Sequence, residues 1–196
     1  MKRRAYTLKK RAESKDATRE RIVEAAMALH EEVGPKETTI SAIAERAGVQ
    51  RLTVYRHFPD ETALFHACTS HWLSLNPPPS FDVWGSVADP EKRCRAALLA
   101  LYRYYRRTQR MWVVSHRDEA EVVAMQEPMA QFRAYLDSIR DGLLKALAPR
   151  ARERRAVAAT LKHALAFTTW ASLSGDRLSD DAMADLMMQW LAGVRG

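Results

Sequence analysis

The sequence predicts an all-α protein in which a small N-terminal helical domain precedes a larger C-terminal helical bundle. Glycine and proline are sparse, with 7 and 8 among 196 residues, which favours helices over a turn-rich sheet. Apolar residues recur at spacings of three and four, and no alternating strand pattern of useful length is present. Because 47% of the residues are hydrophobic, the chain can form one core of moderate size or a small domain attached to a larger one.

The chain begins with a strongly basic segment. Residues 1–21 contain nine Lys or Arg against three Asp or Glu, a net charge of +6, whereas the whole chain carries +7. We expect residues 1–14 to form a flexible basic arm. Such an arm is either a solubilising tail or a segment that follows the phosphate backbone or enters the minor groove of DNA. Its candidate contacts are Arg3, Arg4, Lys9 and Lys10.

Residues 15–75 are predicted to form the first domain. Asp16 or Thr18 can cap its first helix, which Gly34-Pro35 ends. Residues 76–80 contain three consecutive prolines and cannot be helical throughout, so they mark the boundary to a second domain at 76–196.

Two short helices joined by a tight turn are predicted within residues 39–58. Thr39 can cap the first, and Gly48 tolerates the positive φ that is needed where it ends. Ile40, Ile43 and Ala47 belong to an apolar stripe on one face. The second helix is rich in donors, as expected of a helix that enters the DNA major groove. Its polar residues are Gln50, Arg51, Thr53, Tyr55, Arg56 and His57.

Residues 44–49, 53–59 and 63–65 resemble the DNA-binding domain of the TetR family of bacterial transcriptional regulators. The resemblance covers about the first third of the chain. It implies a helix-turn-helix domain, a C-terminal domain that binds a ligand and dimerises, and a function in transcription regulation. The alternative is a helical hairpin that binds protein instead of DNA.

The side chains of the second short helix divide into two kinds of expected DNA contact. Gln50, Arg51, Thr53 and Arg56 suit base edges or phosphates, since Arg pairs with guanine and Gln with adenine. The family resemblance supports roles for Thr39, Thr53, Tyr55 and His57, and we expect Thr39, Tyr55 and His57 to contact phosphates.

The motif departs from the family pattern at two positions. Gln50 stands where the family often has Ser or Thr, and Glu61 stands where it often has a Lys that contacts phosphate.

The C-terminal domain is predicted to contain several more helices. One starts at Asp89-Pro90, and a separate short helix is expected near residues 109–116. Pro128 opens a long helix that Pro149 ends. A continuous helix is predicted over 152–173, and a last one from Ser179 or Asp180 to Gly193.

The last two predicted helices can pair with their copies in a homodimer. The helix at 152–173 has a face of small and medium residues, and the last helix is apolar nearly all round. Both could instead be buried within one chain. The residues expected at the dimer interface are Ala158, Leu161, Leu165, Thr168, Met183, Leu186, Met187 and Trp190.

Aromatic side chains of the second domain suggest a pocket for an apolar or aromatic inducer. His163, Phe167 and Trp170 are spaced at i, i+4 and i+7 on the helix predicted at 152–173. The same rings equally describe an ordinary core, which is the better explanation for each residue taken singly. The candidate ligand-binding residues are Tyr102, Tyr105, Trp112, His116, Phe132, Tyr135, His163, Phe167 and Trp170.

Other classes of protein find little support in the sequence. There is no phosphate-binding glycine loop and no G-x-S-x-G motif, so we expect neither an enzyme nor a cofactor. His66, Cys68 and His71 do not share one helical face, so no metal site is expected. No apolar run reaches 18 residues and no secretory signal follows the basic start. Two cysteines form no disulfide framework, which suits a cytoplasmic protein.

These observations predict a dimeric, ligand-responsive DNA-binding regulator, specifically a repressor that a small molecule releases from a palindromic operator. Two alternatives stay open. One is a DNA-binding regulator without a small-molecule ligand, whose aromatic side chains only fill the core. The other is an enzyme built on a helical bundle.

Overall fold

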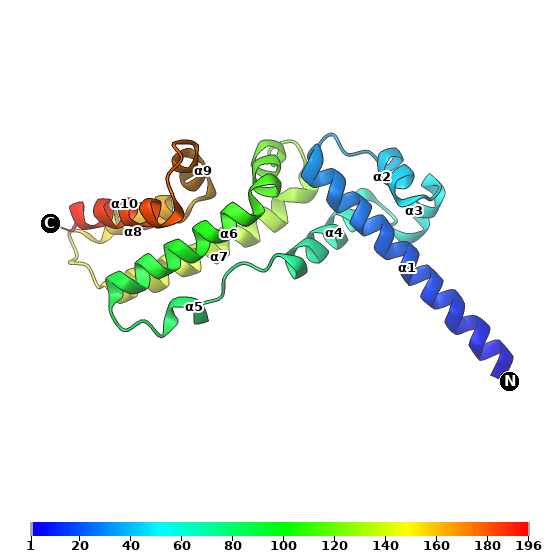
Figure 1. The fold of residues 1–196 in the computed structure, drawn as a ribbon, viewed down its shortest axis with the longest axis horizontal. Helices are drawn as coiled ribbons and strands as arrows, with labels where there is room; N and C mark the ends of the chain where they lie inside the picture. The colour runs from blue at the N-terminus through cyan, green and yellow to red at the C-terminus, as the bar shows by residue number, and fades with distance from the viewer. Residues whose placement is uncertain (1, 196) are drawn as a thin grey trace. The chain divides into compact units, whose positions relative to one another are not determined.

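The computed structural model describes residues 2–195, with the side chains of residue 13 and of residues 15–195. Over this range the fold is all-α, as predicted, with ten α-helices and one 3-10 helix (Figure 1). The chain forms two compact units. The first comprises Met1–Asn76 and Val113–Pro128, and the second comprises Pro77–Trp112 and Met129–Gly196.

The helices follow the chain in a simple order. The first unit contains α1 (Lys2–Glu32), α2 (Ile40–Ala47), α3 (Arg51–His57), α4 (Glu61–Leu75) and the 3-10 helix η1 (Val123–Met125). The second contains α5 (Asp82–Gly85), most of α6 (Pro90–Asp118), most of α7 (Gln126–Leu147), α8 (Arg154–Leu165), α9 (Phe167–Gly175) and α10 (Asp180–Gly193). The last six residues of α6 and the first three of α7 belong to the first unit.

Three predicted helix boundaries are wrong, and the third, at Ala166, is described below. α1 begins at Lys2, so the backbone of residues 2–14, within the arm expected to be flexible at 1–14, is part of the first helix. Its sequence holds no glycine or proline and many good helix formers, which outweighs the high charge. The side chains of Arg3, Arg4, Lys9 and Lys10 lie outside the described residues. The short helix expected at 109–116 is part of the continuous helix α6, because no breaker precedes it.

The core of the first unit lies between α1, α2, α3 and α4, with α2 and α4 both packed against α1 (Figure 1). Thr39 caps α2 as predicted, since its side chain accepts a hydrogen bond from the backbone N–H of Ala42 at 3.2 Å. The buried apolar residues come from all four helices. They include Ile22, Ala26, Leu29, Ile40, Ile43, Ala47, Val54, Phe58 and Leu64.

The C-terminal end of α6 is fastened to the turn between α1 and α2. The buried carboxylate of Asp118 accepts hydrogen bonds from the backbone N–H of Lys36 at 3.1 Å and from Nε of Arg117 at 2.6 Å. Arg117 also donates to the carbonyl of Val33 at 2.7 Å. A Cβ on Gly34 would lie 2.4 Å from the Asp118 carboxylate, so only glycine permits this approach. Residues 113–128, which we expected in the second domain, therefore belong to the first unit.

The helix predicted over 152–173 is divided at Ala166, whose φ of −73° and ψ of 139° are extended. A helix end leaves its last carbonyls without intrahelical partners. Here side-chain hydroxyls supply them: Tyr102 donates to the carbonyl of Ala164 and Tyr105 to that of Leu165, both at 2.8 Å. Thr169 donates to the carbonyl of His163 at 2.7 Å. The break is thus stabilised by hydrogen bonds from outside the helix, which local sequence does not indicate.

Among the described residues, no helix is both long and apolar enough to cross a membrane.

One histidine is buried in the core of the first unit. His30 is 7% exposed, its Nδ1 lies 3.1 Å from Sγ of Cys68, and its ring centroid lies 5.4 Å from that of Phe65. Burial lowers the pKa of His30 to about 4, although the charge of Asp118 acts in the opposite direction. The neutral imidazole is therefore the form that the native core accommodates.

The free energy of unfolding of the first unit should consequently depend on pH. The unfolded chain protonates His30 near its ordinary pKa of 6.5, whereas the folded chain does so only near 4. The stability contributed by neutral His30 is complete above pH 6.5 and is lost as the pH falls towards 4, by up to about 3 kcal/mol. Urea unfolding between pH 7 and 4 measures this loss. His30→Gln should show a flatter profile, and an equally steep profile for this variant would contradict the assignment.

Candidate nucleic-acid interface

Helix α3 is held by two buried side chains and presents the rest of its surface outward. Val54 is 1% exposed, and Phe58, directly after the helix, is 3% exposed. The opposite positions are exposed and lie one helical turn apart. They are Arg51, Leu52, Tyr55 and Arg56. The predicted reading helix therefore has an accessible face with two guanidinium groups, a phenol and an apolar tip, which are groups suited to base edges and phosphates.

The turn before α3 depends on a left-handed residue. Gly48 has φ 66° and ψ 40°, and its N–H donates to carbonyls at the end of α2, including that of Glu45 at 3.1 Å. The next N–H, of Val49, donates to Ala44 at 2.9 Å. A Cβ at Gly48 would meet nothing within 4 Å, so glycine is needed here for its backbone conformation alone.

The departure at Gln50 has a structural consequence. Gln50 occupies the N-cap position of α3, but its side chain makes no capping hydrogen bond. Ser or Thr would commonly cap at such a position. The longer amide side chain of Gln50 is exposed, while Thr53 of the same helix is half-buried.

A basic neighbourhood adjoins the end of α3. The guanidinium of Arg19, from α1, lies 4.8 Å from the centroid of the Phe58 ring. The pKa of the half-buried His57 is lowered first by burial and then by the charges of Lys15 and Arg19. These two α1 residues were counted in the sequence only as part of a basic segment. Their position beside α3 arises from the packing of α1 against the motif, which no local pattern reports.

The second departure places acid at the start of α4. Asp60 caps this helix, because its carboxylate accepts a hydrogen bond from the N–H of Ala63 at 2.7 Å. Glu61 follows in the first turn and is exposed. Both carboxylates suit the positive end of the helix dipole, but an exposed carboxylate here repels a nearby phosphate.

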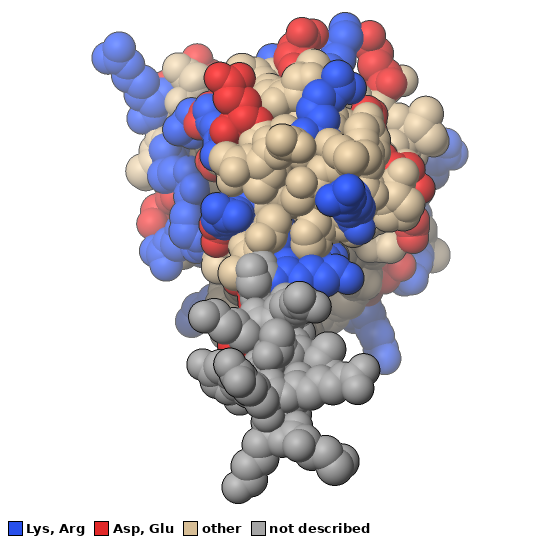
Figure 2. Space-filling view, turned by 90° about the vertical axis from the view of Figure 1, so that its right-hand side faces the viewer, with Lys and Arg blue, Asp and Glu red and all other residues tan. Residues whose placement is uncertain are grey.

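Charge is unevenly distributed on the side of the molecule shown in Figure 2. Lys and Arg side chains stand around a central area of uncharged residues, and Asp and Glu side chains lie mainly towards its edges.

Most of the predicted ligand-binding residues form one packed aromatic cluster in the second unit. The Trp112 and Phe132 rings lie 4.2 Å apart between centroids, and Tyr105 lies 5.4 Å from Phe167 and 6.0 Å from Trp170. Tyr104, which the sequence analysis missed, joins this cluster edge-on to Trp112 at 6.3 Å. Tyr102 is also fully buried, and its hydroxyl donates a hydrogen bond to the carbonyl of Ala164 in α8.

Three predicted ligand-binding residues lie apart from the cluster or at its edge. His116 belongs to the first unit and is exposed. His163 is exposed on α8 and stacks on Trp190 of α10 at 6.2 Å, because the break at Ala166 removes the helical register with Phe167. Tyr135 contacts the cluster through Phe132 at 5.5 Å, but its hydroxyl donates to the carbonyl of Pro79 at 2.5 Å.

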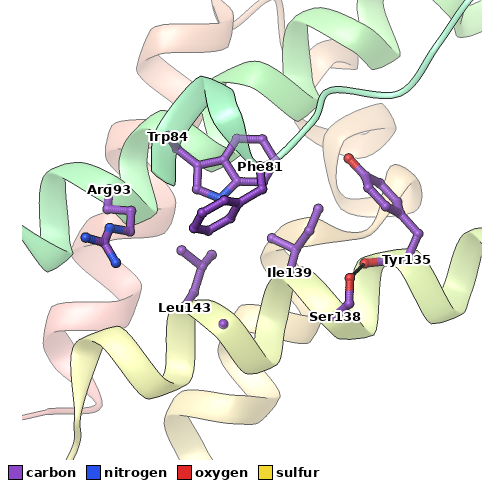
Figure 3. A pocket seen from close by; sticks show the side chains of 8 residues that line it. Phe81, Trp84, Arg93, Tyr135, Ser138, Ile139 and Leu143 are labelled. Atoms are coloured by element: carbon purple, nitrogen blue, oxygen red, sulfur yellow. Dashed lines mark hydrogen bonds between the residues drawn. The ribbon is translucent and has the colours of Figure 1, made fainter. Parts of the chain in front are cut away.

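A cavity of about 100 Å³ lies between α5, the start of α6 and α7. Phe81 and Trp84 form one wall, Ile139 and Leu143 the facing wall, and Arg93 and Tyr135 stand at opposite ends (Figure 3). Ser138 and Gly142 complete the lining. Of the nine predicted ligand-binding residues, Tyr135 alone lines it. The cavity escaped the sequence analysis because its walls come from a loop and two helices distant in sequence.

The predicted dimer residues also divide between core and surface. Leu161, Leu165, Met183 and Met187 are at most 1% exposed and fill the chain's own core. Ala158 and Leu186 are half-buried, and Thr168 is exposed. Trp190 is 46% exposed and borders a shallow hollow of about 500 Å³ on the outer face of α8 and α10. The other residues around this hollow are Ala159, Thr160, His163 and Val194.

No group of three or more His, Cys, Asp or Glu side chains is placed to hold a metal ion in the part of the chain that the structure describes. Cys68 and Cys94 are both buried free thiols, and burial raises the pKa of each to about 12.

Comparison with known proteins connects this geometry to one family. Residues 22–68 match the family model of bacterial regulatory proteins, tetR family. These residues run from the second half of α1 through α2 and α3 into α4, and so contain the turn and the presented helix. None of the curated proteins matches the sequence.

Solved structures share the fold over most of the chain. A TetR-like transcriptional regulator from Rhodococcus sp. RHA1 is 21% identical with a TM-score of 0.67, covering 91% of this chain and 96% of that one. NalD, the secondary repressor of the MexAB-OprM multidrug efflux pump in Pseudomonas aeruginosa, is 19% identical with a TM-score of 0.56, covering 92% and 96%. The fatty acid degradation regulator FadR from Bacillus halodurans is 16% identical with a TM-score of 0.59, covering 88% and 93%.

The matched segment and the fold agree with the resemblance seen in the motif of residues 44–65. The family model describes bacterial regulatory proteins, and the solved structures with this fold are described as transcriptional regulators. Residues 22–68 therefore carry a domain that matches the tetR family of bacterial regulatory proteins, and the chain shares its fold with solved tetR-like transcriptional regulators.

Proposed function

We propose that this regulator binds a palindromic operator as a homodimer, with α3 of each copy in the major groove, and acts as a repressor that a small molecule releases. The observation that carries the DNA-binding part is the outward face of α3, where Arg51, Tyr55 and Arg56 are exposed while Val54 and Phe58 anchor the helix. Two such helices about one DNA turn apart, ~34–36 Å, would read two half-sites.

The residues of the interface take different roles in this proposal. Arg51, Gln50 and Arg56 read base edges, since their polar groups are exposed along one side of α3. Tyr55, His57 and Thr39 contact phosphates, with Thr39 at the positive N-terminus of α2. Thr53 is half-buried, so we assign it a contact with a phosphate or another part of the DNA backbone. Lys15 and Arg19 add positive charge beside His57.

The outer face of α8 and α10 is proposed as the dimer interface. Trp190 is a large aromatic side chain that stacks on His163 yet stays 46% exposed. Small residues around the adjoining hollow, Ala159 and Thr160, allow helices of a second copy to approach closely. A second copy is the occupant that the function requires, because one seven-residue reading helix contacts too few base pairs for a specific site.

Release by a small molecule requires a ligand that binds one conformation more tightly than the other, so ligand and operator must weaken each other reciprocally. The repressor role draws support from the fold shared with NalD, which is a repressor. The competing function is a DNA-binding regulator without a ligand. The packed rings of Trp112, Phe132 and Phe167 favour it, since they fill the region first expected to hold an inducer.

Arg51→Ala and Arg56→Ala should each weaken operator binding by roughly 1–3 kcal/mol and relax the sequence preference at one base pair, if each side chain reads a base. Gel shifts with operator and with scrambled DNA measure both effects. Arg110→Ala, which removes the same charge from an exposed position on α6, is the matched control and should bind like the wild type. Wild-type affinity in both α3 variants would refute their assignment.

Glu61→Lys should strengthen operator binding by roughly three- to tenfold at low salt and steepen the salt dependence, because a repulsive carboxylate becomes a phosphate contact. Glu61→Gln should lie between the two, since it removes the repulsion alone. Binding isotherms over a salt series give the slopes. If all three proteins share one slope, the start of α4 does not approach the DNA backbone.

Ala159→Glu should convert the dimer into monomers by placing a charge in the hollow beside Trp190. Sedimentation velocity at micromolar concentration is the measurement, with the wild type expected as a dimer. Val123→Glu is the control, because Val123 is an apolar residue of the first unit that is 77% exposed. A monomeric wild type, or an Ala159→Glu protein that stays dimeric, would contradict this interface.

A further inference from the structure

We propose that the cavity between α5, α6 and α7 binds a small aromatic carboxylate, of about the size of benzoate. The binding site stands on its own geometry, and its effect on DNA rests on the function proposed above. The cavity is separate from the packed aromatic cluster that the sequence analysis had assigned to a ligand.

The dimensions of the cavity limit its occupant to a single ring. At about 100 Å³ it is far smaller than pockets for drug-sized molecules, which measure roughly 300–1,000 Å³. An apolar protein cavity of about 150 Å³ encloses one benzene, so this smaller cavity encloses only part of a single ring. Two of the lining residues, Ser138 and Gly142, are exposed, so a ligand has an entry path and part of it can extend outward.

The walls favour a flat apolar body. The ring of Trp84 is buried, and Phe81 meets it edge-on with centroids 6.2 Å apart. Phe81 itself is 61% exposed, an unusual position for a phenylalanine that only fills a core. Ile139 and Leu143 face these rings from α7 (Figure 3). A planar ring inserted between the two walls would cover the exposed face of Phe81.

The surface of α7 and the loop before α5 already have the shape that the cavity requires. Gly142 lines the cavity, and a Cβ there would meet nothing within 4 Å, so the helix surface leaves space at this position. Gly85 lets Phe81 lie close against α5, because a Cβ at Gly85 would be 2.3 Å from the Phe81 ring. Tyr135 ties the loop before α5 to α7 through its hydrogen bond to the carbonyl of Pro79.

One end of the cavity carries a positive charge that no carboxylate neutralises. The half-buried Arg93 donates from Nε to the carbonyl of Val87 at 2.8 Å, which fixes the guanidinium. Among the described residues it forms no ion pair. Its two terminal amino groups keep donors for a guest, and a carboxylate is the planar anion that a guanidinium binds best. An aromatic ring between the walls would carry that carboxylate at the Arg93 end.

Isothermal titration of the whole protein with benzoate, and with benzyl alcohol as its uncharged counterpart, tests the site. We expect the wild type to bind benzoate about tenfold more tightly than the alcohol, because the hydrogen bond to Arg93 is charge-assisted. Arg93→Gln should lose that preference and keep the weaker binding of the alcohol. Equal affinity for both compounds in the wild type would overturn the assignment of a carboxylate.

Gly142→Leu should fill the cavity and abolish binding of both compounds. Leucine suits a helix better than glycine and meets open space here, so the melting temperature should not fall. Gly175→Leu, at the end of α9 where a Cβ also meets nothing within 4 Å, is the matched control and should bind as the wild type does. Unchanged benzoate binding by Gly142→Leu, or no benzoate binding by the wild type, would overturn the proposal.

A gel shift with and without benzoate separates this proposal from the proposed function. Loss of operator binding on addition of benzoate, absent in Gly142→Leu, supports both. Benzoate binding that leaves operator affinity unchanged supports the cavity and contradicts release through it. Operator binding by a protein that does not bind benzoate overturns the cavity and leaves DNA recognition intact.

Discussion

The burial of Val54 and Phe58 is the constraint on which the DNA interface depends. A helix of seven residues is too short to persist in water by itself, so α3 exists because the core of the first unit accepts these two side chains. Each buried side chain of this size contributes about 1.5–3 kcal/mol relative to exposure. Since they occupy positions four apart, the opposite side of the helix must face outward. The orientation of Arg51 and Arg56 follows from packing and not from any contact of their own.

A second constraint shapes the C-terminal unit. Tyr102 and Tyr105 are buried aromatic residues whose hydroxyls bind the free carbonyls at the end of α8. This arrangement satisfies polar groups that would be costly to bury unpaired, and it brings the Tyr105 ring against Phe167 and Trp170. The aromatic rings that make these contacts form the packed interior of this unit, which we call the scaffold. The open space lies beside the scaffold, where the loop before α5 covers α7, and the exposed apolar surface lies on α8 and α10.

Local signals in the sequence predicted the first unit well. Thr39 and Gly48 occupy the capping positions that were expected of them, and the i, i+3, i+4, i+7 stripe of α2 is buried. Each of these features is decided by residues within one or two turns of the helix. The resemblance of the motif to a known family rests on the same short segment, which is why the family model confirmed it.

Features set by distant contacts could not be read in this way. No glycine or proline in the sequence indicates the break at Ala166. The break depends on hydrogen bonds from two tyrosines about 60 residues away. The hydrogen bond between Asp118 and the backbone of Lys36 joins residues 82 apart, and the end of α6 lies in a unit where it was not expected. An apolar stripe also fails to say whether it faces a chain's own core or a second copy. For Leu161 and Met183 burial decides for the core.

The most direct test of DNA recognition through α3 is selection of bound sequences from a random pool of duplex DNA by the wild-type protein. The account predicts enrichment of a two-fold symmetric sequence whose half-sites lie about one helical turn apart. Recovery of no preferred sequence, or of one without internal symmetry, would contradict a dimer that reads DNA with paired α3 helices.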